Sequence, residues 1–102
     1  MIYICFQNET DIYDTLPADE PKKFIFTHIK GPPNVAHIQQ KLREVLDKCD
    51  QCNDFIVFNG PSYLTALAGY IWFTQTDRLY ANFYAYNTKD KCYVKHEELL
   101  DA

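Results

Sequence analysis

The sequence predicts an α/β domain with a small, mostly parallel sheet, and three observations point to it. Apolar runs typical of strands alternate along the chain with helical patterns, as in proteins where helices connect parallel strands. Residues 55–58, Phe-Ile-Val-Phe, form a continuous apolar run, which is typical of a strand covered on both faces. The chain has 102 residues and is 47% hydrophobic, which predicts one domain over residues 1–102 with its own core.

The first half of the chain is expected to supply two strands and a helix. The first strand is predicted at residues 2–6, Ile-Tyr-Ile-Cys-Phe. The second is predicted at residues 23–30 and ends before a Gly-Pro-Pro break. Asn34 is expected to cap a helix over residues 35–49, because apolar residues recur there at helical spacing.

The second half is expected to supply a further helix and a terminal hairpin. After the strand at residues 55–58, Ser62 is expected to cap a helix that runs to about residue 73. This helix is apolar nearly all round, so we expect burial on more than one side, with a second copy of the chain on the outer side. A fourth strand is predicted at residues 79–86, and residues 91–95 are predicted as its antiparallel hairpin partner.

Right-handed crossovers between parallel strands then set the topology. They predict the strand order 2-1-3-4, with helices on both faces of the sheet. The order places a switch point between the first and third strands, where ligands bind in open α/β sheets. We therefore expect Gln7 and Asn8, which follow the first strand, to lie beside the turn over residues 59–62.

Composition and cysteine spacing narrow the classes of function. The formal net charge of −4 argues against broad binding to DNA or RNA. No apolar run approaches the ~18 residues of a membrane span, and the chain enters a strand-like run at once, so a cytoplasmic protein is expected. Cys49 and Cys52 have C-x-x-C spacing, but neither a second pair nor a nearby histidine completes a zinc site. We therefore predict no metal.

Polar residues follow each predicted parallel strand and are the candidate ligand-binding residues. Because the carboxyl ends of parallel strands meet at one edge, these side chains are expected to gather there, and the helix after residue 61 adds unpaired amides and a positive dipole end. Such groups suit hydrogen bonding to a nucleobase or a phosphodiester. No G-x-G-x-x-G or P-loop pattern occurs, so no cofactor is predicted. The candidates are Gln7, Asn8, His28, Lys30, Asn59, Ser62, Asn87 and Lys89.

Each of these residues also has a purely structural interpretation. Asn59, Gly60 and Pro61 can simply make a tight turn, and Ser62 can simply cap its helix. Histidine and lysine at strand ends and turns are commonly solvated. A nucleobase or phosphodiester site and a structural turn therefore remain open on these residues alone.

Residues 54–86, with the run Phe-Ile-Val-Phe-Asn-Gly-Pro-Ser-Tyr-Leu-Thr-Ala-Leu-Ala at 55–68, resemble a known family. They are similar to the small CRISPR-associated accessory proteins of type III systems, single-domain relatives of CARF (CRISPR-associated Rossmann-fold) domains. Those proteins bind cyclic oligoadenylate second messengers as dimers, and several cleave them as ring nucleases. The resemblance implies a Rossmann-like, CARF-like fold, and it implies that Gly60, Pro61, Ser62 and Tyr63 approach ligand phosphates.

The resemblance implies metal-independent cleavage of a cyclic oligoadenylate, with cyclic tetra-adenylate as the first candidate. A ribose 2′-OH attacks the adjacent phosphorus and leaves a 2′,3′-cyclic phosphate. The catalytic candidates are Ser62 for charge stabilisation, His28 as base and Asn8 beside them, with Lys30 or Lys89 assisting. Two alternatives stay open, a dimer that binds the nucleotide without chemistry and a protein-interaction module built on the aromatic residues.

Overall fold

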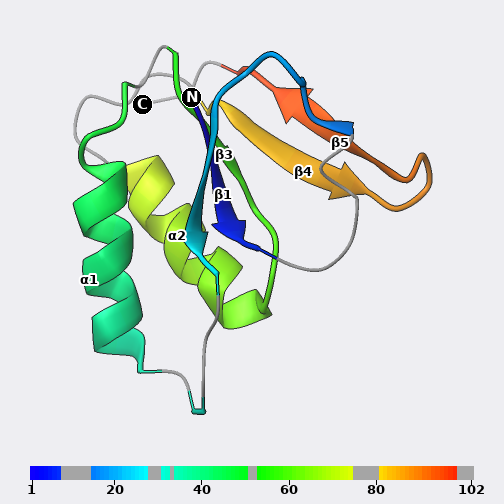
Figure 1. Ribbon diagram of the computed structural model, residues 1–102. Helices are drawn as coiled ribbons and strands as arrows, with labels where there is room; N and C mark the ends of the chain where they lie inside the picture. Colours follow the sequence, from blue (N-terminus) through cyan, green and yellow to red (C-terminus); the bar gives the residue numbers. More distant parts are fainter. Residues whose placement is uncertain (8–14, 28–30, 33, 51–52, 75–80, 99–102) are drawn as a thin grey trace.

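The chain folds around one five-stranded mixed sheet in the order β2-β1-β3-β4-β5 (Figure 1). The computed structural model describes residues 1–7, 15–27, 31–32, 34–50, 53–74 and 81–98. Neighbouring strands from β2 to β4 are parallel, whereas β5 runs antiparallel to β4. The predicted strand order and the terminal hairpin are therefore confirmed. The strands are β1 (Ile2–Phe6), β2 (Lys22–Phe26), β3 (Phe55–Val57), β4 (Phe83–Asn87) and β5 (Cys92–His96).

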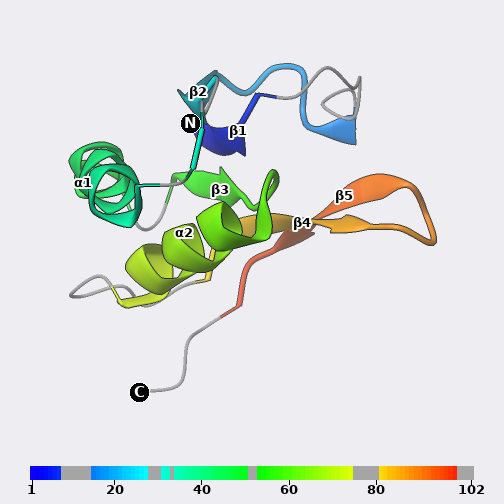
Figure 2. The same ribbon diagram turned by 90° about the horizontal axis from the view of Figure 1, so that it is seen from below.

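Helices α1 (Val35–Leu46) and α2 (Ser62–Thr74) lie on the same face of the sheet (Figure 2). The prediction of helices on both faces is therefore wrong for the described part of the chain. The β2-to-β3 and β3-to-β4 connections cross the sheet in the same direction, so right-handed crossovers place both helices on one side. The β1-to-β2 connection runs the other way, and its described residues contribute Leu16 to the core on the opposite face.

Most element boundaries match the sequence pattern within a few residues. Asn34 caps α1 as predicted, because its side-chain oxygen accepts from the His37 amide at 3.1 Å. α1 ends earlier than expected, with Asp47 at its C-cap. Of the strand expected at residues 23–30, positions 28–30 lie outside the described residues, as do positions 79–80 of the expected fourth strand.

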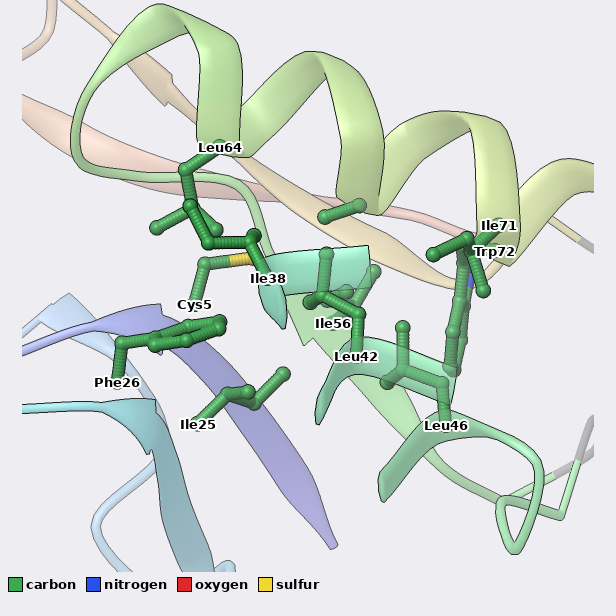
Figure 3. Close-up of a cluster of buried hydrophobic side chains, with 11 residues drawn as sticks. Cys5, Ile25, Phe26, Ile38, Leu42, Leu46, Ile56, Leu64, Ile71 and Trp72 are labelled. Carbon is green, nitrogen blue, oxygen red and sulfur yellow. The ribbon is translucent and has the colours of Figure 1, made fainter. Parts of the chain in front are cut away.

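Two apolar clusters fill the two faces of the sheet. The larger one lies under the helices and includes Cys5, Ile25 and Ile56 from the strands (Figure 3). Within it, Trp72 is fully buried and its Nε1 donates to the Ala81 carbonyl at 2.7 Å. This bond ties the end of α2 to the residues that lead into β4. The smaller cluster comprises Ile2, Ile4, Leu16, Val57, Tyr84 and Tyr93.

Among the described residues, no helix is both long and apolar enough to cross a membrane.

Candidate functional site

The turn between β3 and α2 is fastened to the end of β1 by one side chain. Asn59 is 8% exposed, and its Oδ1 accepts from the Phe6 amide at 3.0 Å. Its Nδ2 donates to the Phe6 carbonyl at 2.5 Å. The side-chain amide thus satisfies both backbone groups of Phe6 and continues the β1–β3 ladder beyond Val57. Asn59, predicted as a ligand-binding residue, is a positioning residue in this structure.

Gly60 brings the turn into direct contact with β1. Its φ is +96°, a conformation that L side chains rarely adopt. A Cβ at this position would lie 2.7 Å from the Phe6 Cβ, so only glycine permits the approach. Gln7 follows Phe6 and is exposed. Its backbone N–H donates to the Phe26 carbonyl at 2.8 Å. The turn and the end of β1 therefore meet at the carboxyl edge of the sheet, as predicted.

Helix α2 begins at this edge with Pro61 in the capping position. The Pro61 carbonyl accepts from the amides of Leu64 and Thr65 at 3.0 and 3.1 Å. The prediction that Ser62 caps the helix is therefore wrong, because the carbonyl that starts the helical ladder belongs to Pro61. Ser62 is instead the first helical residue and is exposed. The amides of Ser62 and Tyr63 precede the helical ladder, so they are placed to bind an anion.

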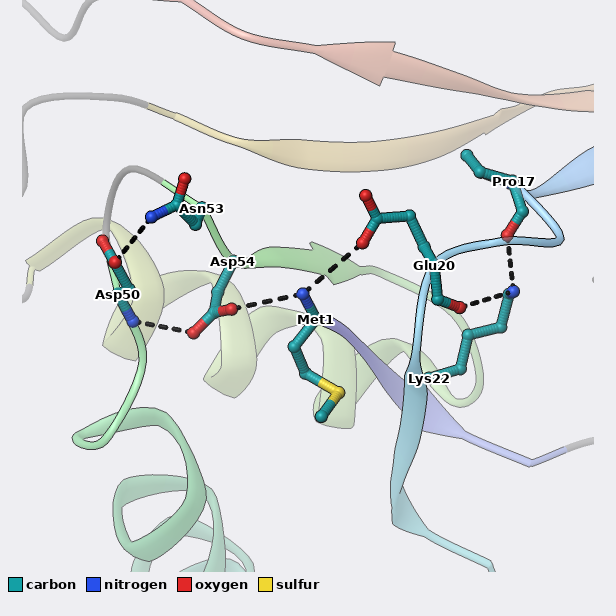
Figure 4. Close-up of polar contacts among 7 residues, drawn as sticks. All are labelled: Met1, Pro17, Glu20, Lys22, Asp50, Asn53 and Asp54. Atoms are coloured by element: carbon teal, nitrogen blue, oxygen red, sulfur yellow. Dashed lines mark hydrogen bonds and ion pairs between the residues drawn. The ribbon is translucent and has the colours of Figure 1, made fainter.

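Charge differs between the two edges of the sheet. The first turn of α2 contains no acidic residue, so nothing in it opposes an anion at the carboxyl edge. At the amino edge, the Met1 ammonium lies 3.4 Å from an Asp54 carboxylate oxygen and 3.6 Å from one of Glu20 (Figure 4). Asp54 also accepts from the Asp50 amide at 2.7 Å. Carboxylates therefore gather at the amino edge, which favours the carboxyl edge for a phosphate.

The two ionisable side chains of β1 with a raised pKa do not supply a nucleophile. Burial raises the pKa of the Cys5 thiol to about 12, although a backbone hydrogen bond at Asn59 lowers it in part. Burial, with contributions from Cys49 and Asp54, raises the pKa of Tyr3 to about 12. Both groups stay protonated at neutral pH, so Cys5 lacks the thiolate that cysteine chemistry requires.

The β4–β5 hairpin carries two predicted ligand-binding residues away from this edge. Asn87 Oδ1 accepts from the amides of Lys89 and Asp90 at 3.0 and 3.3 Å, and its Nδ2 donates to the Asp90 carboxylate at 3.1 Å. Asn87 therefore builds the hairpin turn. Lys89 is exposed at the tip, and Figures 1 and 2 both show the tip projecting away from the start of α2. The structure therefore does not bring Asn87 and Lys89 together with Ser62.

Three predicted site residues fall outside the described part of the chain, and one residue that shapes the site was not predicted. Asn8, His28 and Lys30 lie outside the described residues. Phe6 was not predicted as part of the site, although Asn59 is hydrogen-bonded to its backbone and Gly60 packs closely against it. The glycine that follows the strand and Asn59 was the sequence signal that two backbone segments approach closely at this point. Within the described residues, no group of three or more His, Cys, Asp or Glu side chains is placed to hold a metal ion.

A shallow depression elsewhere does not compete with this site. It lies on the outer face of α1, between side chains such as Gln40, Arg43 and Glu44. Its lining residues all belong to α1 or to the C-cap of that helix and are mostly polar or charged, so it fits an ordinary solvated helix surface.

No protein-family model, curated protein or solved structure matches this chain.

Proposed function

We propose that this protein binds a cyclic oligoadenylate at the β3–α2 turn and opens the ring without a metal. The observation that carries the proposal is the way the β3–α2 turn is held at the end of β1. Asn59 and Gly60 hold it against Phe6, which leaves the Ser62 hydroxyl and the first amides of α2 at the carboxyl edge. A helix start of this kind favours an anion by about 0.3–1 kcal/mol when exposed and by up to ~2 kcal/mol when partly buried.

The proposed reaction needs alignment and charge stabilisation more than a strong acid and base. The 2′-OH of one ribose attacks the neighbouring phosphorus, and the P–O5′ bond breaks. The 2′-OH loses its proton and the departing 5′ oxygen gains one, so the products are a 2′,3′-cyclic phosphate and a free 5′-OH. Ser62 and the α2 amides donate hydrogen bonds to the phosphoryl oxygens as negative charge builds on them. We place this activity in a homodimer and in type III CRISPR antiviral signalling, as the sequence resemblance implies, and in the cytoplasm, as the sequence pattern led us to expect.

A second candidate function is binding of the same ligand without cleavage. The observation in its favour is the chemistry of the described residues at the edge. Gln7 and Ser62 are exposed there and carry an amide and a hydroxyl group, which suit hydrogen bonding better than proton transfer at neutral pH. Such a protein would sequester the messenger or sense it.

One experiment separates the two candidates. Purified protein is incubated with cyclic tetra-adenylate in EDTA, and the nucleotides are separated by chromatography over time. Linear products ending in a 2′,3′-cyclic phosphate support the nuclease. Intact nucleotide that co-elutes with the protein supports the binding protein. Intact nucleotide that does not co-elute contradicts both for this ring size.

A pair of variants links either result to the turn. Ser62→Glu places a carboxylate in the first turn of α2, where it stabilises the helix by about 0.3–1 kcal/mol but repels a phosphate. Thr74→Glu, at the other end of the same helix, is the matched control. We expect Ser62→Glu to weaken nucleotide binding at least ~10-fold with an unchanged or raised melting temperature. Equal binding by both variants would contradict a site at this turn.

A further inference from the structure

Asn59 and Gly60 form a pair that is chemically labile in any polypeptide. An asparagine side chain loses ammonia when the backbone nitrogen of the next residue attacks its carbonyl carbon, which makes asparagine one of the thermolabile residues. The attack is easiest when glycine follows, because glycine has no Cβ to hinder the approach and leaves its backbone most free to move. Asn59 is the only asparagine in the chain that precedes a glycine.

The fold depends on this labile pair. Gly60 has φ +96°, and a Cβ at this position would lie 2.7 Å from the Phe6 Cβ. At position 59 the side chain must accept a hydrogen bond from the Phe6 amide and donate one to the Phe6 carbonyl. An ionised aspartate can only accept. The two residues that hold the turn against β1 are therefore the same two that make it reactive.

The hydrogen bonds to Phe6 oppose the reaction while the chain is folded. Ring closure requires the side-chain carbonyl carbon of Asn59 to turn toward the Gly60 nitrogen. The Asn59 side chain is instead 8% exposed and is held at 3.0 and 2.5 Å by the backbone of Phe6. Breaking both bonds leaves poorly solvated donors and acceptors without partners, which costs free energy. The reaction therefore proceeds from a minor open state, and its rate follows the population of that state.

The reaction consumes water and releases ammonia. The Gly60 nitrogen loses its proton and bonds to the side-chain carbonyl carbon of Asn59, and the side-chain nitrogen leaves as ammonia. Water then opens the resulting succinimide ring at either of its two carbonyls. One opening gives aspartate, and the other gives isoaspartate, in which the main chain runs through the former side chain. No oxidant or reductant takes part.

Both products lack the donor that joins the turn to β1. Asn59 Nδ2 donates to the Phe6 carbonyl, whereas a carboxylate would set an acceptor against that carbonyl. Isoaspartate also lengthens the main chain at residue 59 by one carbon, directly before the place where Gly60 lies against Phe6. Conversion therefore removes the contact that positions the start of α2 at the carboxyl edge of the sheet.

We propose that Asn59 is a site of spontaneous deamidation, which the folded chain suppresses through the hydrogen bonds to Phe6 and which releases the β3–α2 turn from β1 once it has occurred. A chain in which this turn opens repeatedly then acquires a permanent carboxylate at the base of the turn. The inference is tested without nucleotide, so its failure and the failure of the nucleotide proposal are separate results.

The first test compares conversion in the folded and the unfolded chain. Purified protein is aged in mildly alkaline buffer and in denaturing urea, and mass spectrometry of its peptides follows the amide and the two acids at residue 59. We expect conversion to be at least ~10-fold slower in buffer than in urea. Equal rates in the two conditions would overturn the protection by the fold.

Two controls test the role of glycine in urea, where folding has no part. Asn53 precedes Asp54 and is measured in the same digests, and we expect it to convert more slowly than Asn59. In Gly60→Ala the added Cβ hinders the attack, so we expect Asn59 to convert at least ~10-fold more slowly than in the wild type. An unchanged rate in Gly60→Ala would refute the assignment of the lability to this pair.

The last test measures what conversion does to the turn. Chains aged in urea are refolded, and ion exchange separates the converted chains by their additional negative charge. Peptide mapping selects the fraction that is altered at residue 59, and Asn59→Asp supplies one product as a standard. We expect the converted chains to unfold at a lower urea concentration than unconverted chains from the same sample, or to fail to refold. An unchanged urea midpoint would refute the release of the turn.

Discussion

Replacing Gly60 by alanine tests the contact that holds the candidate site in place. The backbone at Gly60 has φ +96°, and adopting it with an L side chain costs about 1–2 kcal/mol. The new Cβ would also lie 2.7 Å from Phe6 Cβ and 3.1 Å from Phe6 Cγ. Ordinary carbon contacts lie at about 3.5–4.0 Å, so the turn or β1 must shift by about 1 Å.

The shift is costly because the atoms that the new Cβ meets belong to the first part of the Phe6 side chain, next to the backbone. Phe6 is also hydrogen-bonded to Asn59 through both backbone groups, so moving it strains those bonds. Overpacking of this kind typically costs about 1–3 kcal/mol. Together with the backbone strain, we expect Gly60→Ala to lower the free energy of unfolding by about 2–5 kcal/mol. That is a large share of the ~5–15 kcal/mol typical of a domain.

Gly31→Ala is the matched control for this change. Gly31 also has a positive φ, +70°, but apart from its chain neighbours no atom of the described residues lies within 4 Å of a Cβ built there. The control therefore carries the backbone strain without the collision, and we expect it to cost about 1–2 kcal/mol. Urea unfolding followed by tryptophan fluorescence measures both variants. Free energies of unfolding that agree within about 0.5 kcal/mol would refute the role assigned to Phe6.

Two further predictions concern neighbouring residues. The pKa of Cys5 is about 12 in the folded chain against an ordinary value of 9.0, so the folded state holds this proton more tightly. The Cys5 thiol should therefore leave stability unchanged below about pH 9 and should lower it by up to ~1.4 kcal/mol per pH unit from there towards pH 12. Cys5→Ala should make the decline of the urea midpoint with pH shallower over that range, and an unchanged slope would contradict this. Asn59→Asp keeps the acceptor for the Phe6 amide but sets a carboxylate against the Phe6 carbonyl, so calorimetry should show a loss of about 2–4 kcal/mol. Asn53→Asp, at an exposed side chain, should cost less than ~1 kcal/mol, and an equal loss in the two variants would rule out the bridging role of Asn59.

Local patterns predicted the elements because local chemistry forms them. The apolar run at β1 and the capping oxygen of Asn34 each act within a few residues, and both agree with the structure. The strand order also followed, because right-handed crossovers leave few topologies. The same rule places both helices on one face once the direction of each crossover is taken into account.

The site was harder to predict because its geometry depends on contacts that are distant in sequence. Asn59 reads locally as a turn residue or a ligand donor, and its bonds to Phe6 join positions 53 apart in the chain. Asn87 differs, since an asparagine that bonds amides two and three residues ahead is a local turn signal. Asn87 lies between the two strands of the predicted hairpin, so its role in the turn was accessible from the sequence, although it was also proposed as a ligand contact.

The buried indole described above gives the molecule a built-in optical reporter. Trp72 is the only tryptophan in the chain, and it is fully buried with its N–H bonded to the Ala81 carbonyl. Its emission therefore reports on one place, the junction between the end of α2 and the approach to β4. If this junction opens before the rest of the fold, the fluorescence transition will precede the loss of circular dichroism. Coincident transitions would instead mean that the junction and the sheet unfold as one unit.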